Sequence, residues 1–131
     1  MSAPNVTGAV IYAKDLPRLV AFYRDVTGLP VTHSETDYAI LEAGTFQLVV
    51  HAIPPGIAAT IHVASPPLRR EDAAVKLIFP IPSIDASRTL AALHGGALNP
   101  PEREWQFQGC RICDGHDPEG NVIQLREHAG A

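Results

Sequence analysis

The sequence has no long apolar run, no excess of basic residues and only two cysteines among its 131 residues. A membrane-spanning helix needs about 18 or more consecutive apolar residues, and no stretch approaches that length, so we expect no membrane association. The formal net charge is −4 without a basic stripe, which argues against a nucleic-acid partner. The first ten residues contain no basic segment followed by a long apolar segment, so the sequence predicts no signal peptide.

The two cysteines, Cys110 and Cys113, form a C-x2-C-x2-H pattern with His116. A closed structural zinc site needs four ligands, and the chain supplies no second pair. A thioredoxin-like motif would lead into a helix, whereas a turn follows here. The two thiols have opposite parity on a strand and therefore face opposite sides of a sheet. We interpret them as reduced packing residues, which together with the missing export signal favours the cytoplasm.

The first half of the chain has the pattern of a strand followed by a helix. Residues 9–13 are apolar and β-prone. Asp15 is a suitable N-cap, apolar side chains then recur at helical spacing, and Gly28 stands where a left-handed residue ends a helix. We expect a helix near 15–28, followed by three strands with the sequences LPVTHS, YAILEAG and TFQLVVHAI.

The second half repeats this pattern. Residues 77–81 are again β-prone, and Ser83 is the N-cap of a helix expected near 83–95. A shift of 68 residues places Gly8 on Lys76, and three strand-like segments again follow: ALNP, FQGCRICDG and NVIQLREH. Self-similarity at so long a period indicates two copies of one βαβββ unit rather than a solenoid.

These units divide the chain into module one, about 6–53, and module two, about 73–127, within one domain that spans 1–131. The linker between them, about 54–72, contains four prolines, and we expect at most a short strand in it at 60–63. Hydrophobic residues make up 46% of the chain, which is enough for the core of one globular domain.

This pattern resembles the vicinal-oxygen-chelate superfamily, which contains glyoxalase I, extradiol dioxygenases, and fosfomycin and bleomycin resistance proteins. The resemblance covers residues 6–127 and rests on the two modules, the segment DLPRLVAFYRDVTGL and the turn DPEGN. It implies an α+β fold in which the two βαβββ modules curl mixed sheets into half-barrels that enclose a ligand cavity. In small members the cavity often forms across a homodimer interface, so the resemblance also implies a homodimer.

In metal-dependent members the ligands lie at four inward-facing strand positions, which the resemblance places at Gly8, Gln47, Lys76 and Gln124. Gly8 has no side chain, the Lys76 ammonium has no lone pair, and the two glutamines offer only neutral amide oxygens. A divalent cation in such a site needs carboxylates or imidazoles. We therefore expect no metal ion and no cofactor. Gln124 stands where metal-binding relatives carry Glu, and it keeps the hydrogen bonding without the charge.

Lys76 has two interpretations. Its ammonium can reach water at the sheet edge while the stem covers apolar neighbours. Alternatively, the cation lies in the cavity and binds an anionic or carbonyl group of a ligand.

The other polar and aromatic candidates also have a structural and a functional interpretation. Trp105 and Phe107 share a strand parity and are either core residues or a pocket wall that stacks on a flat ligand. His51 and His116 lie near strand ends, as surface residues or at the mouth of a cavity. If these two histidines converge, they would form a displaced metal site.

Two functions are compatible with these residues. The first is a metal-independent protein that binds a small molecule, with Lys76, Gln124, Gln47, Trp105, Phe107, His116 and His51 as candidate ligand-binding residues. The alternative is a metal-dependent enzyme of the same superfamily, a glyoxalase-like lyase or isomerase or a dioxygenase, with a displaced metal site. The sequence identifies neither the ligand nor any catalytic residue.

Overall fold

A computed structural model describes residues 4–128. The first half forms one sheet with strand order β1-β4-β3-β2, in which β1 runs parallel to β4 and the other pairs are antiparallel. Its elements are β1 (Thr7–Ala13), α1 (Leu16–Thr27), β2 (Val31–Ser34), β3 (Tyr38–Ala43) and β4 (Phe46–Ala52). This is the βαβββ order expected from the sequence.

The second half forms a sheet with strand order β5-β9-β8-β6, and β7 pairs with another part of β8. Its elements are β5 (Leu77–Ile81), α3 (Ile84–Leu93), β6 (Ala97–Leu98), the 3-10 turn η1 (Pro101–Arg103), β7 (Trp105–Phe107), β8 (Cys110–His116) and β9 (Val122–His128). The single strand expected over FQGCRICDG is instead a hairpin of β7 and β8. Gln108 and Gly109 turn the chain there with positive φ angles of 50° and 74°.

The linker contains the one-turn helix α2 (Pro55–Ala58). The short strand expected at 60–63 is absent from this described segment, because residues 60–63 pair with no strand. Both helix starts agree with the sequence, since Asp15 accepts a hydrogen bond from the Arg18 backbone N–H and Ser83 accepts one from Ala86. None of the helices within residues 4–128 is both long and apolar enough to cross a membrane.

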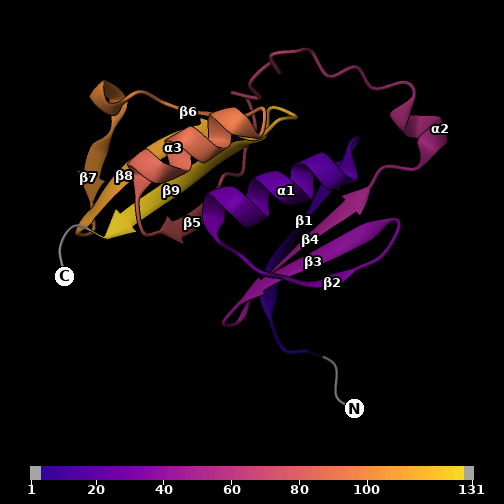
Figure 1. Cartoon of the computed structure of the whole chain (residues 1–131), viewed down its shortest axis with the longest axis horizontal. Coiled ribbons are helices and arrows are strands. Elements are labelled where there is room, and N and C mark those ends of the chain that lie inside the picture. The colour runs from indigo at the N-terminus through magenta and orange to yellow at the C-terminus, as the bar shows by residue number, and fades with distance from the viewer. Residues whose placement is uncertain (1–3, 129–131) are drawn as a thin grey trace.

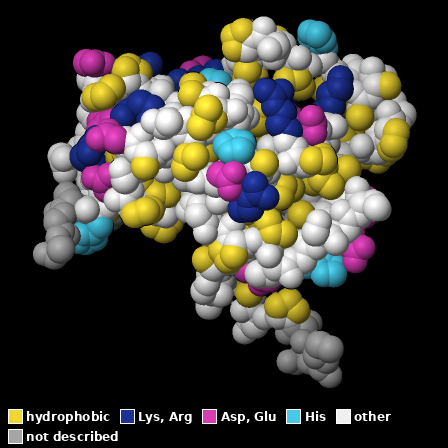
Figure 2. Space-filling model, viewed as in Figure 1, with side chains coloured by type: hydrophobic (Ala, Val, Ile, Leu, Met, Phe, Trp, Pro, Cys, Tyr) yellow, Lys and Arg dark blue, Asp and Glu magenta, His cyan; other side chains and the backbone are white. Residues whose placement is uncertain are grey.

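The two sheets lie side by side, and α1 and α3 cover one face of them (Figure 1). The expected α+β fold of two βαβββ modules is confirmed, but the sheets are not closed into a barrel. One apolar core runs through both modules, and the Phe79 ring of β5 contacts Tyr23 of α1 and Phe46 of β4 at centroid distances of 5.7 and 6.2 Å. On the side seen in Figure 2, acidic and basic side chains lie next to one another rather than in patches of one sign.

Successive residues of each strand point alternately toward the helices and toward the opposite side of the sheet. We call the sides away from the helices the first open face, on β1 to β4, and the second open face, on β5 to β9. The first open face includes Val10, Tyr12, Tyr38, Glu42, Gln47 and His51. The second open face includes Lys76, Ile78, Trp105, Phe107, Ile112, Asp114, His116, Gln124 and Arg126.

Candidate functional site

The second open face brings together five of the seven side chains expected from the sequence: Lys76, Gln124, Trp105, Phe107 and His116. Their neighbours on the same strands, including Ile123, Leu125 and Cys113, are buried in the core against the helices. The other two residues, Gln47 and His51, lie on the first open face. The candidate residues therefore belong to two separate sheets.

Lys76 does not present a free cation. Its Nζ donates a hydrogen bond to Asp114 Oδ2 at 2.6 Å, and Gln124 Nε2 donates to Asp114 Oδ1 at 3.2 Å. The Lys76 side chain is 40% exposed, whereas Asp114 is only 17% exposed. Asp114 thus balances the charge of Lys76 and fixes the Gln124 amide. Sequence reasoning missed Asp114, because its contact with Gln124 depends on the pairing of β8 with β9.

Arg126 is a second cation that sequence reasoning missed. Its Nε donates to Gln124 Oε1 at 2.9 Å and its Nη1 donates to Gln108 Oε1 at 3.0 Å. The guanidinium carbon lies 5.4 Å from the centre of the Phe107 ring, in cation–π geometry. The parity of Arg126 with Gln124 on β9 was the available signal for this placement.

Trp105 and Phe107 are not core residues. They lie on β7 with 42% and 51% of their surface exposed. Ile112 of β8 pairs with Trp105 of β7 on one side and with Arg126 of β9 on the other. Ile112 is fully buried although it faces away from the helices. This part of the second open face therefore exposes two aromatic side chains beside one cation, with Ile112 buried between the strands.

On the first open face, His51 lies between two tyrosines. Its ring is stacked on Tyr38 at 6.0 Å and 12°, and it lies 6.2 Å from Tyr12. Its Nδ1 donates a hydrogen bond to the Ala52 carbonyl at 2.9 Å, which in the neutral imidazole leaves the lone pair on Nε2. Gln47 Nε2 donates to Glu42 Oε2 at 3.4 Å.

His116 makes the same kind of bond as His51, from Nδ1 to the Asp117 carbonyl at 3.0 Å. The two histidines nevertheless lie on different sheets. Within residues 4–128, no three His, Cys, Asp or Glu side chains are grouped so that they could hold a metal ion.

The four positions implied by the resemblance do not suit a metal either. A Cβ atom at Gly8 would overlap the Gln47 carbonyl oxygen, so the backbone leaves no room for a ligating side chain there. Lys76 is already ion-paired with Asp114.

The strand pairing shows that Gln47 and Gln124, although the resemblance places a ligand position at each, are not counterparts in the two modules. Gly8 pairs with Gln47, whereas Gln124 pairs with Ile78. The 68-residue shift places Val10 on Ile78, and Val10 pairs with Val49, so the structural counterpart of Gln124 is Val49. The two glutamines share a side of their sheets but stand two residues apart in the repeat.

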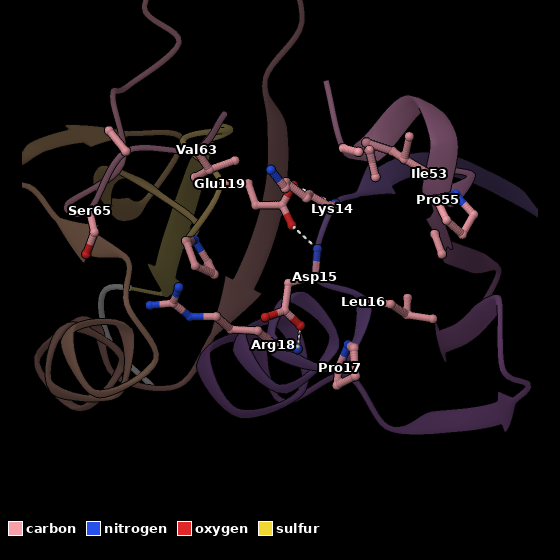
Figure 3. Close-up of a pocket in the computed structure, with 15 residues that line it drawn as sticks. Lys14, Asp15, Leu16, Pro17, Arg18, Ile53, Pro55, Val63, Ser65 and Glu119 are labelled. Atoms are coloured by element: carbon pink, nitrogen blue, oxygen red, sulfur yellow. Dashed lines mark hydrogen bonds between the residues drawn. The ribbon is translucent and has the colours of Figure 1, made fainter. Parts of the chain in front are cut away.

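A cavity of about 690 Å³ lies where the linker crosses the start of α1 (Figure 3). Two of its polar side chains, Glu119 and Lys14, make contacts that join the segments around it. Glu119 Oε1 and Oε2 accept hydrogen bonds from the backbone N–H groups of Lys14 and Asp15 at 2.8 and 2.9 Å, and Lys14 Nζ donates to the Ile61 carbonyl. We interpret this cavity as the seam between the linker and the modules.

A second cavity of about 410 Å³ lies between β1 and the edge formed by β5 and β9. Val10 and Tyr12 line it from the first open face, and Val122 lines it from the second. This cavity adjoins Lys76, because Val75 and Leu77 on either side of that residue are part of its wall. Both modules therefore contribute to one cleft at the meeting edge of the sheets.

Residues 8–126 match the family described as glyoxalase-like domain. No significant match was found among curated proteins. Among solved structures, a glyoxalase/bleomycin resistance protein from Albidiferax ferrireducens T118 is similar with a TM-score of 0.64 and 16% identity, over 92% of this chain and 96% of that one. A bleomycin-binding protein from Streptomyces verticillus, in complex with copper(II)-bleomycin, is similar with a TM-score of 0.56 and 19% identity, over 97% and 98%. At these identities the structural likenesses show the fold alone.

Proposed function

Because this chain belongs to the glyoxalase-like domain family, we propose that it is a small-molecule-binding member of the glyoxalase/bleomycin resistance/dioxygenase superfamily that works without a metal ion. The observation that carries this proposal is the network of Lys76, Asp114 and Gln124. A lysine ammonium, already paired with a carboxylate, stands at one of the positions that metal-dependent members use for a ligand. A divalent cation there would have to displace the Lys76 ammonium from Asp114, and Gln124 would offer it only a neutral amide oxygen.

The exposed aromatic residues support a binding role. Trp105 and Phe107 flank Ile112 and Arg126 on the second open face, and such a combination of apolar surface with a few fixed polar groups is typical of ligand sites. The relative from Streptomyces verticillus, which holds copper(II)-bleomycin, shows that a protein with this fold can bind a small molecule.

The alternative is a metal-dependent lyase, isomerase or dioxygenase with a displaced site. His51 and His116 favour it, because each uses Nδ1 on a backbone carbonyl and leaves Nε2 as a lone-pair donor. That arrangement is common for metal-ligating histidines.

Elemental analysis and a thermal-shift screen distinguish the two functions. We expect protein purified without chelator to hold far less than one transition metal per chain. We also expect small aromatic ligands to raise the melting temperature equally with and without EDTA, since a ligand at 100 times its Kd stabilises by about 2.7 kcal/mol. About one metal per chain, retained through dialysis and lost in a His51→Ala or His116→Ala variant, would establish the alternative instead.

We further propose a two-fold homodimer in which the open faces are covered. Val10, Tyr12 and Ile78 are about half exposed or more on these faces, and contiguous apolar surface of this kind marks interaction sites.

Light scattering tests this assembly. We expect a mass near 28.0 kDa, twice the 14.0 kDa of the chain, at micromolar concentration. Val10→Asp on the first open face should shift the mass toward the monomer. Leu93→Asp should not, because Leu93 is at least as exposed as Val10 (75% against 54%) but lies on α3. A wild-type mass of 14.0 kDa would contradict the dimer.

We place this function in the cytoplasm, again as a proposal. Cys110 and Cys113 are both free, and their positions on opposite sides of β8 are compatible with a reducing compartment.

A further inference from the structure

The most informative feature of the second open face is the uncompensated charge of Arg126. Within residues 4–128, no carboxylate pairs with this guanidinium, whose hydrogen-bond acceptors are the neutral amide oxygens of Gln124 and Gln108. On the helix side of the same sheet, by contrast, Arg88 and Arg111 share the carboxylate of Glu104. Asp114, the nearest acid along the network, is already occupied by Lys76.

The guanidinium is also held in a fixed orientation. Bonds to Nε and Nη1 and the stacking on Phe107 define its plane. Arginine has five N–H donors, and the hydrogen bonds of Arg126 within residues 4–128 use two of them, so three are left for a ligand in this part of the chain. A planar donor group with a free edge matches the geometry of a carboxylate, which can accept two parallel hydrogen bonds.

The neighbours of Arg126 define the rest of the ligand. Trp105, Ile112 and Arg126 lie in one row across three adjacent strands. Strands are spaced by about 4.8 Å, so the backbone positions of Trp105 and Arg126 are about 10 Å apart. Ile112 between them is fully buried, so an aromatic ring in that span would lie against the exposed Trp105 side chain with its carboxylate at Arg126. Phe107 limits the site next to the guanidinium.

We infer that Arg126 is the ligand-recognising cation of this protein and that the ligand is a small aromatic carboxylate, with its ring against the exposed Trp105 side chain. This inference rests on the proposed small-molecule-binding function and specifies its ligand class. It also disfavours the interpretation in which Lys76 is the cation that binds the ligand, because Asp114 balances the charge of Lys76.

The test uses trans-cinnamate and its neutral analogue trans-cinnamamide as probes, in the full-length protein. Trp105 is the only tryptophan, so its fluorescence reports binding at this site. We expect wild type to bind cinnamate at least about tenfold more tightly than cinnamamide. Arg126→Gln should lower the affinity for cinnamate roughly ten- to hundredfold, which is the usual contribution of a hydrogen bond between charged groups. Cinnamamide affinity should change little.

Three further variants make the result specific. Arg103→Gln removes the same charge from an exposed position on η1 and should leave both probes unaffected. Lys76→Met should lower the affinity for cinnamate less than Arg126→Gln does. Arg126→Lys should restore part of the preference for cinnamate, and it covers the case in which Arg126→Gln is poorly folded.

Equal affinity of wild type for the two probes would overturn the role of Arg126 and leave the binding function intact. An equal loss of cinnamate affinity in the Arg126→Gln and Arg103→Gln variants would also overturn the role of Arg126. If neither probe changes the Trp105 fluorescence at millimolar concentration, the inference about aromatic carboxylates is wrong. The proposed function is then judged separately, by the chelator-insensitive thermal-shift screen.

Discussion

Replacing Asp117 with alanine is expected to lower the free energy of unfolding by about 3–5 kcal/mol, a large share of the roughly 5–15 kcal/mol typical of a domain. Asp117 is fully buried in the turn before β9. Its carboxylate accepts hydrogen bonds from the Tyr23 hydroxyl at 2.6 Å, from the backbone N–H groups of Glu119 and Asn121, and from Asn121 Nδ2. Alanine would leave these donors without an acceptor, at a cost of about 1–3 kcal/mol for each one that stays buried.

Tyr23→Phe removes one of these hydrogen bonds and should cost about 1.5–3 kcal/mol, because the acceptor is charged. Urea unfolding of the single and double variants gives the coupling between the two residues, which belong to different modules. Asp72→Ala, at an exposed turn of the linker, is the control and should stay within about 0.5 kcal/mol of wild type. An Asp117→Ala variant as stable as this control would refute the role of the bond.

The same pair has a consequence at alkaline pH. Burial, followed by the charge and hydrogen bond of Asp117, raises the pKa of the Tyr23 phenol well above its ordinary value. The unfolded chain ionises this group near pH 10, whereas the folded chain keeps it neutral. The stability from Tyr23 is therefore present below about pH 10 and is lost as pH rises toward the raised pKa. Tyr23→Phe should lack this part of the alkaline destabilisation.

The DPEGN turn shows what the sequence can indicate and what it cannot. The segment marks the family in the sequence, but the structure explains its residues. Asp117 binds Tyr23 of module one, and Glu119 accepts two backbone N–H groups at the start of α1. Gly120 has a φ of 88°, and a Cβ there would overlap the Leu68 carbonyl of the linker. The turn therefore joins the two modules. The partners of Asp117 and Glu119 lie about 100 residues away in the sequence, and local sequence patterns do not reveal contacts over that distance.

The helices were predictable because their signals are local. The caps Asp15 and Ser83 and the stop at Gly28 act within a few residues, and the structure has all three. The repeat of these signals was enough to predict two βαβββ modules. By contrast, α2 and the β7–β8 hairpin were missed, because their local signals are weaker. The signal for α2 is a proline pair followed by small residues, and the signal for the hairpin is a Gln-Gly turn.

The polar network of the site was only partly predictable. Strand parity places Gln124 and Lys76 on one side of the sheet, but their partners follow from register. Asp114 meets Gln124, and Ile112 meets Arg126, only through the pairing of β8 with β9. A shift of one residue would turn these side chains to the helix side. For this reason the sequence left the role of the Lys76 cation open, whereas the contacts show that it is paired with Asp114 and that Arg126 has only amide partners.

Replacing Glu104 with alanine is the second change for which we expect a large effect, a loss of about 2–4 kcal/mol. The Glu104 side chain is only 8% exposed, and its Oε1 accepts hydrogen bonds from Arg111 Nε and Nη2 at 2.7 and 2.6 Å. Its Oε2 pairs with Arg88 of α3. Removing one partner from a buried ion pair costs about 3–5 kcal/mol, and the partial exposure of the two arginines reduces that figure.

The effect should reach the ligand site, because Glu104 directly precedes β7. Its ion pairs anchor the start of the strand that carries Trp105 and Phe107. In Glu104→Ala we therefore expect the Trp105 emission to shift to the red and both cinnamate and cinnamamide to bind more weakly, since Trp105 and Phe107 move while Arg126 keeps its charge. Glu102→Ala, two residues earlier on exposed η1, is the matched control. If both variants show wild-type stability and emission, Glu104 does not hold β7. A loss of cinnamate binding alone would mean that Glu104 acts through Arg126 rather than through Trp105 and Phe107.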